Sequence, residues 1–113
     1  MLGVGGNLTA ELQIRTTVKN EIGEKVPYWM TVQTLTGWLD FMSGETRYTT
    51  YNSKIEESSH VWVGEYEPID PRVTAENSRL VINGNAYDIV LMDNPMMLNY
   101  QWEIYLRFTG GAN

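Results

Sequence analysis

Residues 80–108 read LVINGNAYDIVLMDNPMMLNYQWEIYLRF, and this stretch decides the fold. Its last part has a large apolar residue at every second position: Tyr100, Trp102, Ile104, Leu106 and Phe108. Because side chains alternate between the two faces of a strand, this spacing predicts a β-strand with one buried face. Each large ring that is buried removes roughly 150–250 Å² from water, which is worth about 4–6 kcal/mol as an upper bound. Such a strand can anchor a small barrel or sandwich.

The first part of the same stretch predicts a β-hairpin. Two apolar runs, 80–82 and 87–91, flank the tetrapeptide Asn-Gly-Asn-Ala at 83–86. Its Asn-Gly pair tolerates the positive φ angles that a tight hairpin turn requires. The chain is therefore expected to form two antiparallel strands here before the long aromatic strand begins.

Two segments nearer the N-terminus also have strand patterns. Residues 11–19 alternate apolar and polar side chains, which predicts a strand with one polar face, and 20–25 turn the chain around Gly23. Residues 26–42 are rich in valine, threonine and aromatic residues, which predicts a long second strand. Within it, Gly37 indicates a β-bulge.

The middle of the chain predicts one long loop between strands. Residues 43–59 are mostly small and polar, with a few apolar residues at helix-like separations, which indicates a loop with one or two helical turns. A further strand is expected at 60–66, before two prolines stop the pairing. About six short strands separated by turns predict an all-β fold, a small six-stranded barrel-like domain that is closed or nearly closed.

The composition limits the domain count and the chemistry. The 113 residues suffice for a single domain, 1–113, with flexible glycine-rich ends expected at 1–8 and 110–113. The chain contains no cysteine, which excludes disulfides and thiolate chemistry. We also expect neither a signal peptide nor a membrane span. The net charge of −6 and the pI near 4.6 disfavour tight contact with phosphates, and they suit a surface past which DNA slides without sticking.

Sequence patterns of catalytic and cofactor sites do not occur. His60 is the only histidine, so a two-histidine metal site cannot form within one chain, and we expect it to be a partly buried strand residue with a hydrogen-bonded ring. The fourteen acidic residues match no EF-hand loop. The chain also has no nucleophile elbow, phosphate-binding loop or dinucleotide fingerprint. We therefore predict a protein without catalytic activity, cofactor or metal.

The four tryptophans leave a binding function open. A small β-barrel could use exposed tryptophans to stack against a carbohydrate or single-stranded nucleic acid. Tryptophans within alternating strands are expected to lie in the core instead, and acidic residues near two of them disfavour nucleic acid. The residues concerned are Trp29, Trp38, Trp62 and Trp102.

Three segments, taken in order, carry a resemblance to a known family. They are GWLDFMSGE at 37–45, followed by the polar loop, then VWV at 61–63, and finally SRLVINGNAYDI at 78–89. This order resembles the small head-tail joining proteins of tailed bacteriophages, also called head-closure, neck or stopper proteins and in some cases minor capsid proteins. The resemblance covers residues 11–108.

The resemblance implies a structural protein of the virion neck, assembled in the host cytoplasm. Such a protein is a small β-barrel that forms a homo-oligomeric ring, usually twelve-fold, below the portal and its adaptor. The ring closes the DNA-filled head and offers an attachment face to the tail proteins. DNA passes through its channel without specific binding, and no membrane, cofactor or metal takes part.

By its position, the long loop would reach toward the channel or a neighbouring subunit. Its acidic residues would help to give a lumen that repels phosphate, although its two basic residues offset part of that charge. The predicted site residues in this loop are Glu45, Arg47, Tyr48, Tyr51, Lys54, Glu56 and Glu57. A binding module with exposed tryptophans remains the alternative, and an enzyme whose carboxylates converge only in the fold is a third.

Overall fold

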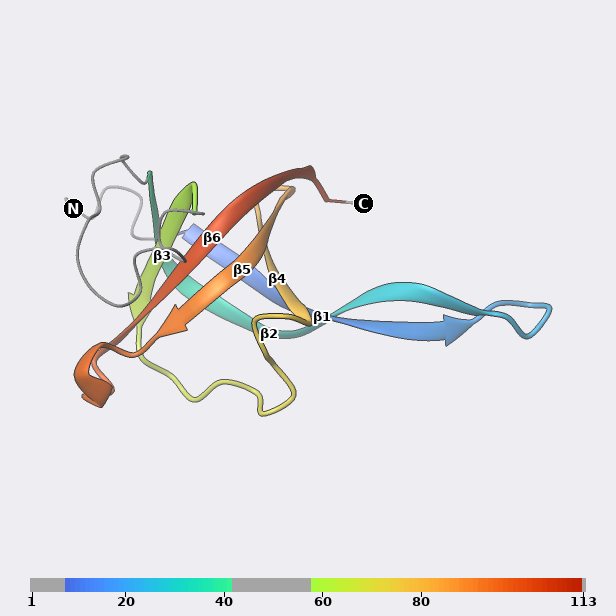
Figure 1. Cartoon of the computed structure of the whole chain (residues 1–113), viewed down its shortest axis with the longest axis horizontal. Helices are drawn as coiled ribbons and strands as arrows, with labels where there is room; N and C mark the ends of the chain where they lie inside the picture. The colour runs from blue at the N-terminus through green and yellow to red at the C-terminus, as the bar shows by residue number, and fades with distance from the viewer. Residues whose placement is uncertain (1–7, 42–57, 113) are drawn as a thin grey trace.

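The computed structural model describes residues 8–41 and 58–112, which form six antiparallel strands in one closed sheet (Figure 1). The neighbours around the sheet follow the order β1-β2-β3-β6-β5-β4, and β4 pairs back to β1. The predicted all-β, six-stranded barrel-like fold is confirmed, although the sheet closes into a ring that is not evenly barrel-shaped. The strands are β1 (Leu8–Lys19), β2 (Lys25–Phe41), β3 (His60–Glu65), β4 (Ser78–Ile82), β5 (Asn85–Asp93) and β6 (Gln101–Gly111).

Alternate side chains of all six strands fill the barrel. The largest side chains that are almost completely buried are Trp62, Leu12, Leu80, Ile82, Ile104 and Leu106. Trp62 lies in the middle of β3, the short strand that pairs with both β2 and β6. The core is therefore built around the ring of Trp62, which is surrounded by aliphatic residues and Tyr87 from the other strands.

The predicted apolar face of β6 is buried only in its middle. Ile104 and Leu106 are fully buried, but Tyr100 is 77% exposed and Phe108 is 47% exposed. Period-two spacing fixes which face of a strand a side chain occupies, but it does not fix how far the neighbouring strands extend to cover that face. Tyr100 and Phe108 lie near the two ends of the strand, so the prediction that they are buried is wrong.

The predicted hairpin is confirmed as β4, a two-residue turn and β5. Asn83 and Gly84 have φ angles of 51° and 80°, as a tight Asn-Gly turn requires. The predicted loose tail at 110–113 is wrong for its first three residues. β6 continues through Gly111, which pairs with Asn85, and the Ala112 N–H donates to the Gly84 carbonyl at 2.8 Å. Glycine can extend a strand through its backbone hydrogen bonds, although it has no side chain from which the sequence could predict the strand.

Gly37 has a different role from the predicted bulge. The β1–β2 register shifts between Leu12 and Gln13, whereas Gly37 pairs regularly with Gly64 of β3. A Cβ on Gly37 would lie 2.3 Å from the carbonyl oxygen of Val63 and 2.8 Å from the Cα of Gly64. This glycine is thus required by the close approach of two backbones.

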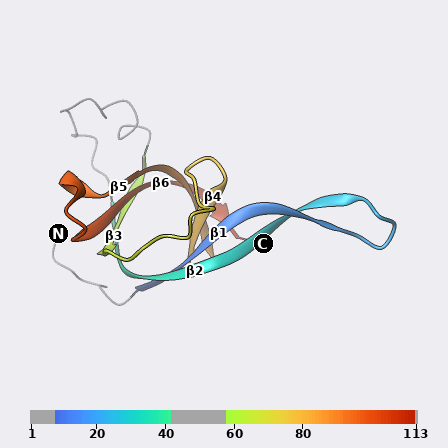
Figure 2. The same ribbon diagram turned by 90° about the horizontal axis from the view of Figure 1, so that it is seen from below.

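β1 and β2 continue beyond the barrel as a two-stranded ribbon (Figure 1, Figure 2). β4 pairs with β1 as far as Ile14, and the Arg15 N–H donates to the Asn77 carbonyl at 2.8 Å. Beyond this point the register pairs 16–19 with 25–28. The described molecule is 50 Å long but only 26 and 25 Å across. We call residues 16–28 the arm.

Candidate assembly surface

The seven predicted loop residues lie outside the described part of the chain, which omits 42–57. They are Glu45, Arg47, Tyr48, Tyr51, Lys54, Glu56 and Glu57. Their contact with a channel or a neighbour therefore stays a prediction. The point at which the chain rejoins the sheet is well defined, because the Ser59 N–H donates to the Leu106 carbonyl at 2.8 Å.

The arm is held in shape by its turn and by strand pairing. The Asn20 side-chain oxygen accepts hydrogen bonds from the N–H groups of Ile22 at 3.1 Å and Glu24 at 2.9 Å. Gly23 adopts a φ of 87°, which a residue with a side chain rarely takes. An Asx-type turn with a left-handed glycine is a common way to reverse the chain tightly. The sequence predicted this turn, but not that it would stand away from the barrel.

One face of the arm is apolar. The register pairs Thr16 with Tyr28 and Val18 with Val26, so these four side chains share a face. This face continues the core-facing side of Ile14, but no barrel strand covers it. Val18 is 43% exposed and Tyr28 is 48% exposed. We call these four residues the arm apolar face.

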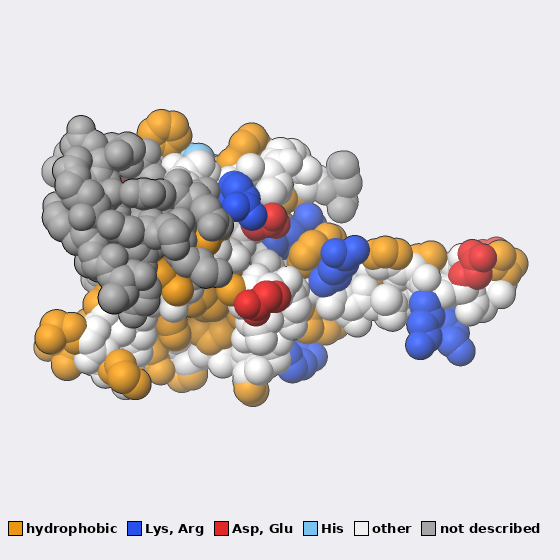
Figure 3. Space-filling view, in the orientation of Figure 1, with side chains coloured by type: hydrophobic (Ala, Val, Ile, Leu, Met, Phe, Trp, Pro, Cys, Tyr) orange, Lys and Arg blue, Asp and Glu red, His pale blue; other side chains and the backbone are white. Residues whose placement is uncertain are grey.

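The opposite face and the tip of the arm carry its charges. Lys19 and Lys25 occupy positions that alternate with the apolar face, Arg15 lies on the same side just before the arm, and Glu21 and Glu24 lie in the turn. In Figure 3, hydrophobic side chains follow one edge of the projecting arm, and basic side chains gather on the other. The arm is therefore an amphipathic ribbon whose apolar face lacks a cover in the described chain.

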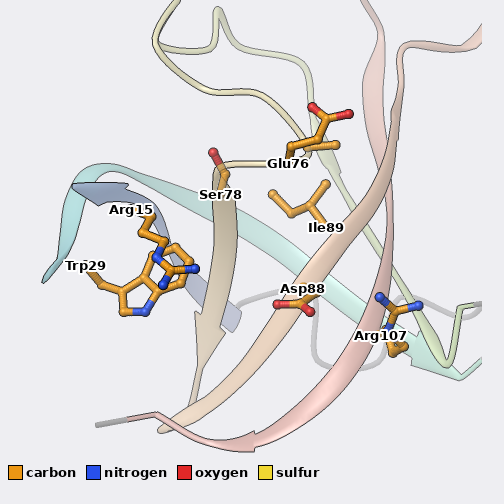
Figure 4. A pocket seen from close by; sticks show the side chains of 8 residues that line it. Arg15, Trp29, Glu76, Ser78, Asp88, Ile89 and Arg107 are labelled. Carbon is orange, nitrogen blue, oxygen red and sulfur yellow. The ribbon is translucent and has the colours of Figure 1, made fainter. Parts of the chain in front are cut away.

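A set of cross-strand contacts lies at the base of the arm, just outside residues 16–28. The Arg79 guanidinium lies 4.3 Å from the centre of the Trp29 ring, and its Nε donates to the Gln13 side-chain oxygen at 2.8 Å. Burial lowers the pKa of Arg79, although the nearby Asp88 carboxylate opposes this effect. Asp88 is the register partner of both Arg79 and Arg107. Figure 4 shows Asp88 and Arg107 within the pocket beside this junction. Asp88 thus lies between two arginines on neighbouring strands, and this alternation of opposite charges stabilises the base of the arm.

The other end of the molecule carries a second exposed apolar surface. Here the 3-10 turn η1 (Pro95–Met97) joins β5 to β6, and Asn94 and Asn99 close it through a side-chain hydrogen bond of 2.8 Å. Met96, Met97 and Asn99 have positive φ angles, a conformation that non-glycine residues seldom adopt. This turn presents four exposed apolar side chains, which we call the turn patch: Met96, Met97, Leu98 and Tyr100.

Acidic residues lie at the strand ends beside the turn patch. Asp93 at the end of β5 pairs with Glu103 near the start of β6, and Glu65 ends β3 opposite Gln101. Burial raises the pKa of Asp93, and the neighbouring Glu103 carboxylate raises it further. Burial together with Glu103 also raises the pKa of Tyr105 to about 12. The turn patch is thus bordered by negative charge that the described chain does not neutralise locally.

Asp93→Asn is expected to stabilise the isolated subunit at pH 7 by about 0.2–1 kcal/mol, because it removes a like charge directly opposite Glu103. The raised pKa of Asp93 means that the folded state favours its protonated form, so the stability it provides at low pH is lost as the pH rises through its folded-state pKa. The gain should therefore vanish below about pH 3, where Asp93 is protonated in both states. Urea unfolding at both pH values measures this, and an equal gain at both would contradict it.

His60 is a structural residue in this fold. Its Nδ1 lies 2.8 Å from the Ser59 hydroxyl, and its ring makes edge-on contacts with Phe41 and Tyr87 at centroid distances of 5.0 and 5.1 Å. Burial lowers its pKa. The expectation of a partly buried histidine with a hydrogen-bonded ring is confirmed.

None of the four tryptophans is among the exposed large apolar side chains of the described chain. Trp62 is in the core and Trp29 lies under Arg79. The ring of Trp102 stacks on Tyr66 at 5.6 Å, and its Nε1 donates to the Glu67 carbonyl at 2.9 Å. The Nε1 of Trp38 is buried, and within the described residues no acceptor reaches it. The geometry offers these rings little room to act as a stacking platform.

Comparisons with known proteins leave the chain without an assigned family, because no family model and no curated protein matches its sequence. Within residues 8–41 and 58–112, no three carboxylate or imidazole side chains come together as metal ligands would. The described part likewise contains no helix with the length and hydrophobicity to cross a bilayer. The two apolar surfaces and their bordering charges are the features that function has to explain.

Proposed function

We propose that this protein is a structural subunit of the neck of a phage or prophage particle. Its ring lies below the portal and its adaptor, closes the DNA-filled head and provides the face to which the tail attaches. One observation carries the proposal: a closed barrel extends a long amphipathic arm whose apolar face the described chain leaves uncovered.

The closed barrel makes the arm the natural means of assembly. The six strands close on themselves within the barrel, so the long free edges of the sheet lie on residues 16–19 of β1 and 25–36 of β2, which include the arm. A two-stranded ribbon is only marginally stable in water by itself, so covering its apolar face with a neighbour stabilises both partners. A subunit of this form is suited to assembly through its projections.

The charge distribution supports a channel through which DNA passes without binding. Outside residues 15–28, the described part of the chain has nine acidic and three basic residues. Such a surface repels phosphates, whereas a protein that grips DNA gains affinity from clustered lysine and arginine. We therefore propose that the protein binds the portal, adaptor and tail proteins and does not grip the DNA that passes through the ring.

Deleting this gene from the parent phage is expected to leave filled or leaking heads lying apart from complete free tails, because the joint between them is missing. Negative-stain electron microscopy of the lysate detects these products. Supplying the wild-type chain from a plasmid should restore joined, infectious particles, which controls for effects on neighbouring genes. Intact infectious particles without the protein would overturn the proposal.

A further inference from the structure

A pocket of about 490 Å³ lies on the outer face of the sheet, where β2, β1 and β4 are neighbours. Along β1 and β4, the residues that line it alternate with the buried core residues, so their side chains point away from the barrel interior. Apolar and polar side chains both contribute to its walls. Those that matter here are Glu11, Gln13, Pro27, Trp29, Arg79 and Val81.

Arg79 is held in a fixed orientation within this pocket. Its guanidinium lies 4.3 Å from the centre of the Trp29 ring, and its Nε donates to the Gln13 side-chain oxygen at 2.8 Å. The Gln13 side-chain nitrogen in turn donates to the Thr31 hydroxyl at 3.0 Å and to the Glu11 carboxylate at 3.2 Å. Because the acceptor is itself fixed, little rotamer freedom is left for Arg79 to lose when it binds a ligand.

The terminal nitrogens of Arg79 have no partner in the described chain. A guanidinium carries five N–H groups, and the bond to Gln13 uses one of them. Within residues 8–41 and 58–112, no acceptor takes a hydrogen bond from the other N–H groups of Arg79, and no carboxylate pairs with it directly. Arg72 differs, because its Nε and Nη2 both donate to the Asp70 carboxylate, at 3.0 and 2.8 Å.

We propose that this pocket binds a carboxylate group of an acidic peptide segment. The terminal nitrogens of Arg79 donate to the carboxylate oxygens, an interaction that the planar guanidinium makes with two parallel hydrogen bonds. The apolar walls formed by Pro27, Trp29 and Val81 contact the side chain next to the acidic residue. This inference goes beyond the neck function and is argued from the contacts of the pocket alone.

Glu11 makes the pocket selective for a single negative charge. Its carboxylate lies on the far side of the Gln13 amide from Arg79, and it also lines the pocket. One cation and one anion therefore contribute to the lining, so a doubly charged phosphate is repelled more strongly than a carboxylate. We expect the pocket to bind an acidic side chain better than it binds a phosphate.

NMR titration of the isotopically labelled full chain tests the proposal. The probe is the blocked peptide acetyl-Leu-Glu-Leu-amide, and its match without charge is acetyl-Leu-Gln-Leu-amide. Binding is followed through the Arg79 Nε–H and Trp29 indole N–H signals. The glutamate peptide should have a Kd at least roughly tenfold lower than the glutamine peptide, because it alone makes charge-assisted hydrogen bonds. Sodium acetate and inorganic phosphate should both bind more weakly than the glutamate peptide.

Two variants and one matched control locate the site through the Trp29 signal. Arg79→Lys keeps the positive charge but loses the planar fork, and Gln13→Ala removes the group that orients it, so each should weaken binding of the glutamate peptide roughly tenfold. Arg72→Lys changes an arginine that Asp70 already pairs, and it should leave the Kd unchanged. The spectrum of each variant shows whether it is folded.

Several results would overturn the inference. Absence of binding, or equal Kd values for the glutamate and glutamine peptides, would rule out recognition of a carboxylate. Acetate binding as tightly as the peptide would remove the role of the apolar walls, and tighter binding of phosphate would indicate a general anion site. An equal loss in Arg72→Lys would place the peptide elsewhere. The gene deletion decides the neck function separately, so either proposal can fail alone.

Discussion

Gly37→Ala is expected to lower the free energy of unfolding by about 3 kcal/mol and the Tm by roughly 10 °C or more. The added Cβ would lie 2.3 Å from the Val63 carbonyl oxygen and 2.8 Å from the Cα of Gly64. Both atoms belong to the backbone of β3, so no flexible side chain can move aside. The pairing of β2 with β3 must open instead, and this disturbs the strand that carries Trp62. Thermal and urea unfolding followed by tryptophan fluorescence measure the effect.

Gly111→Ala is the control for Gly37→Ala. A Cβ at Gly111 meets no atom within 4 Å, although this glycine also lies in a paired strand. Its replacement should change the free energy of unfolding by less than about 0.5 kcal/mol. Similar losses in the two variants would show that the close approach at Gly37 is not what limits the side chain there.

Replacing residues 16–28 with the dipeptide Asn-Gly is expected to abolish self-association while leaving the barrel folded. The arm makes no contribution to the described core, and β1 holds β4 through Ala10 to Ile14, which the replacement keeps. Its loss should weaken association at least roughly 100-fold, equivalent to about 2.7 kcal/mol. Sedimentation velocity measures the association, and thermal unfolding confirms that the barrel remains.

Two point variants test whether association depends on the apolar face of the arm or only on its length. Val18→Asp places a charge on the arm apolar face, whereas Thr17→Asp places the same charge on the opposite face. We expect only Val18→Asp to reproduce the loss of association, since a buried unpaired carboxylate is costly at an interface. If the shortened chain still associates like the wild type, the arm is not the assembly element.

The strands and the central hairpin follow from local sequence rules. Alternating apolar residues define β1 and β6, and the Asn-Gly pair at 83–84 needs no distant contact to favour a turn. These signals depend on side-chain spacing and on backbone preferences within a few residues. For the same reason the sequence also predicted the single six-stranded fold and the structural role of His60.

The candidate site was found only in part. Sequence analysis placed it in the loop that contains Glu45 to Glu57, which lies outside the described residues, and it missed the arm. The alternation of Thr16 and Val18 with charged neighbours resembles that of any half-buried strand. One signal was present, since the alternation on the first strand continues from Leu12 to Lys19, up to the turn at Asn20. That signal indicates a long strand that pairs up to the turn, but it does not show that the neighbouring strand β4 ends at Ile14 and leaves residues 16–19 uncovered.

The sequence by itself determined which residues form strands, where the chain turns and that the domain is all-β, because these depend on period-two patterning and turn chemistry. Tertiary structure alone decided which apolar faces are covered. Val18 and Tyr100 have the same pattern as buried residues, yet both are exposed because the neighbouring strands end before reaching them. It also decided that Gly37 is a point of backbone contact. Burial and close approach depend on how far distant segments extend in space, and residue spacing along the chain does not contain that information.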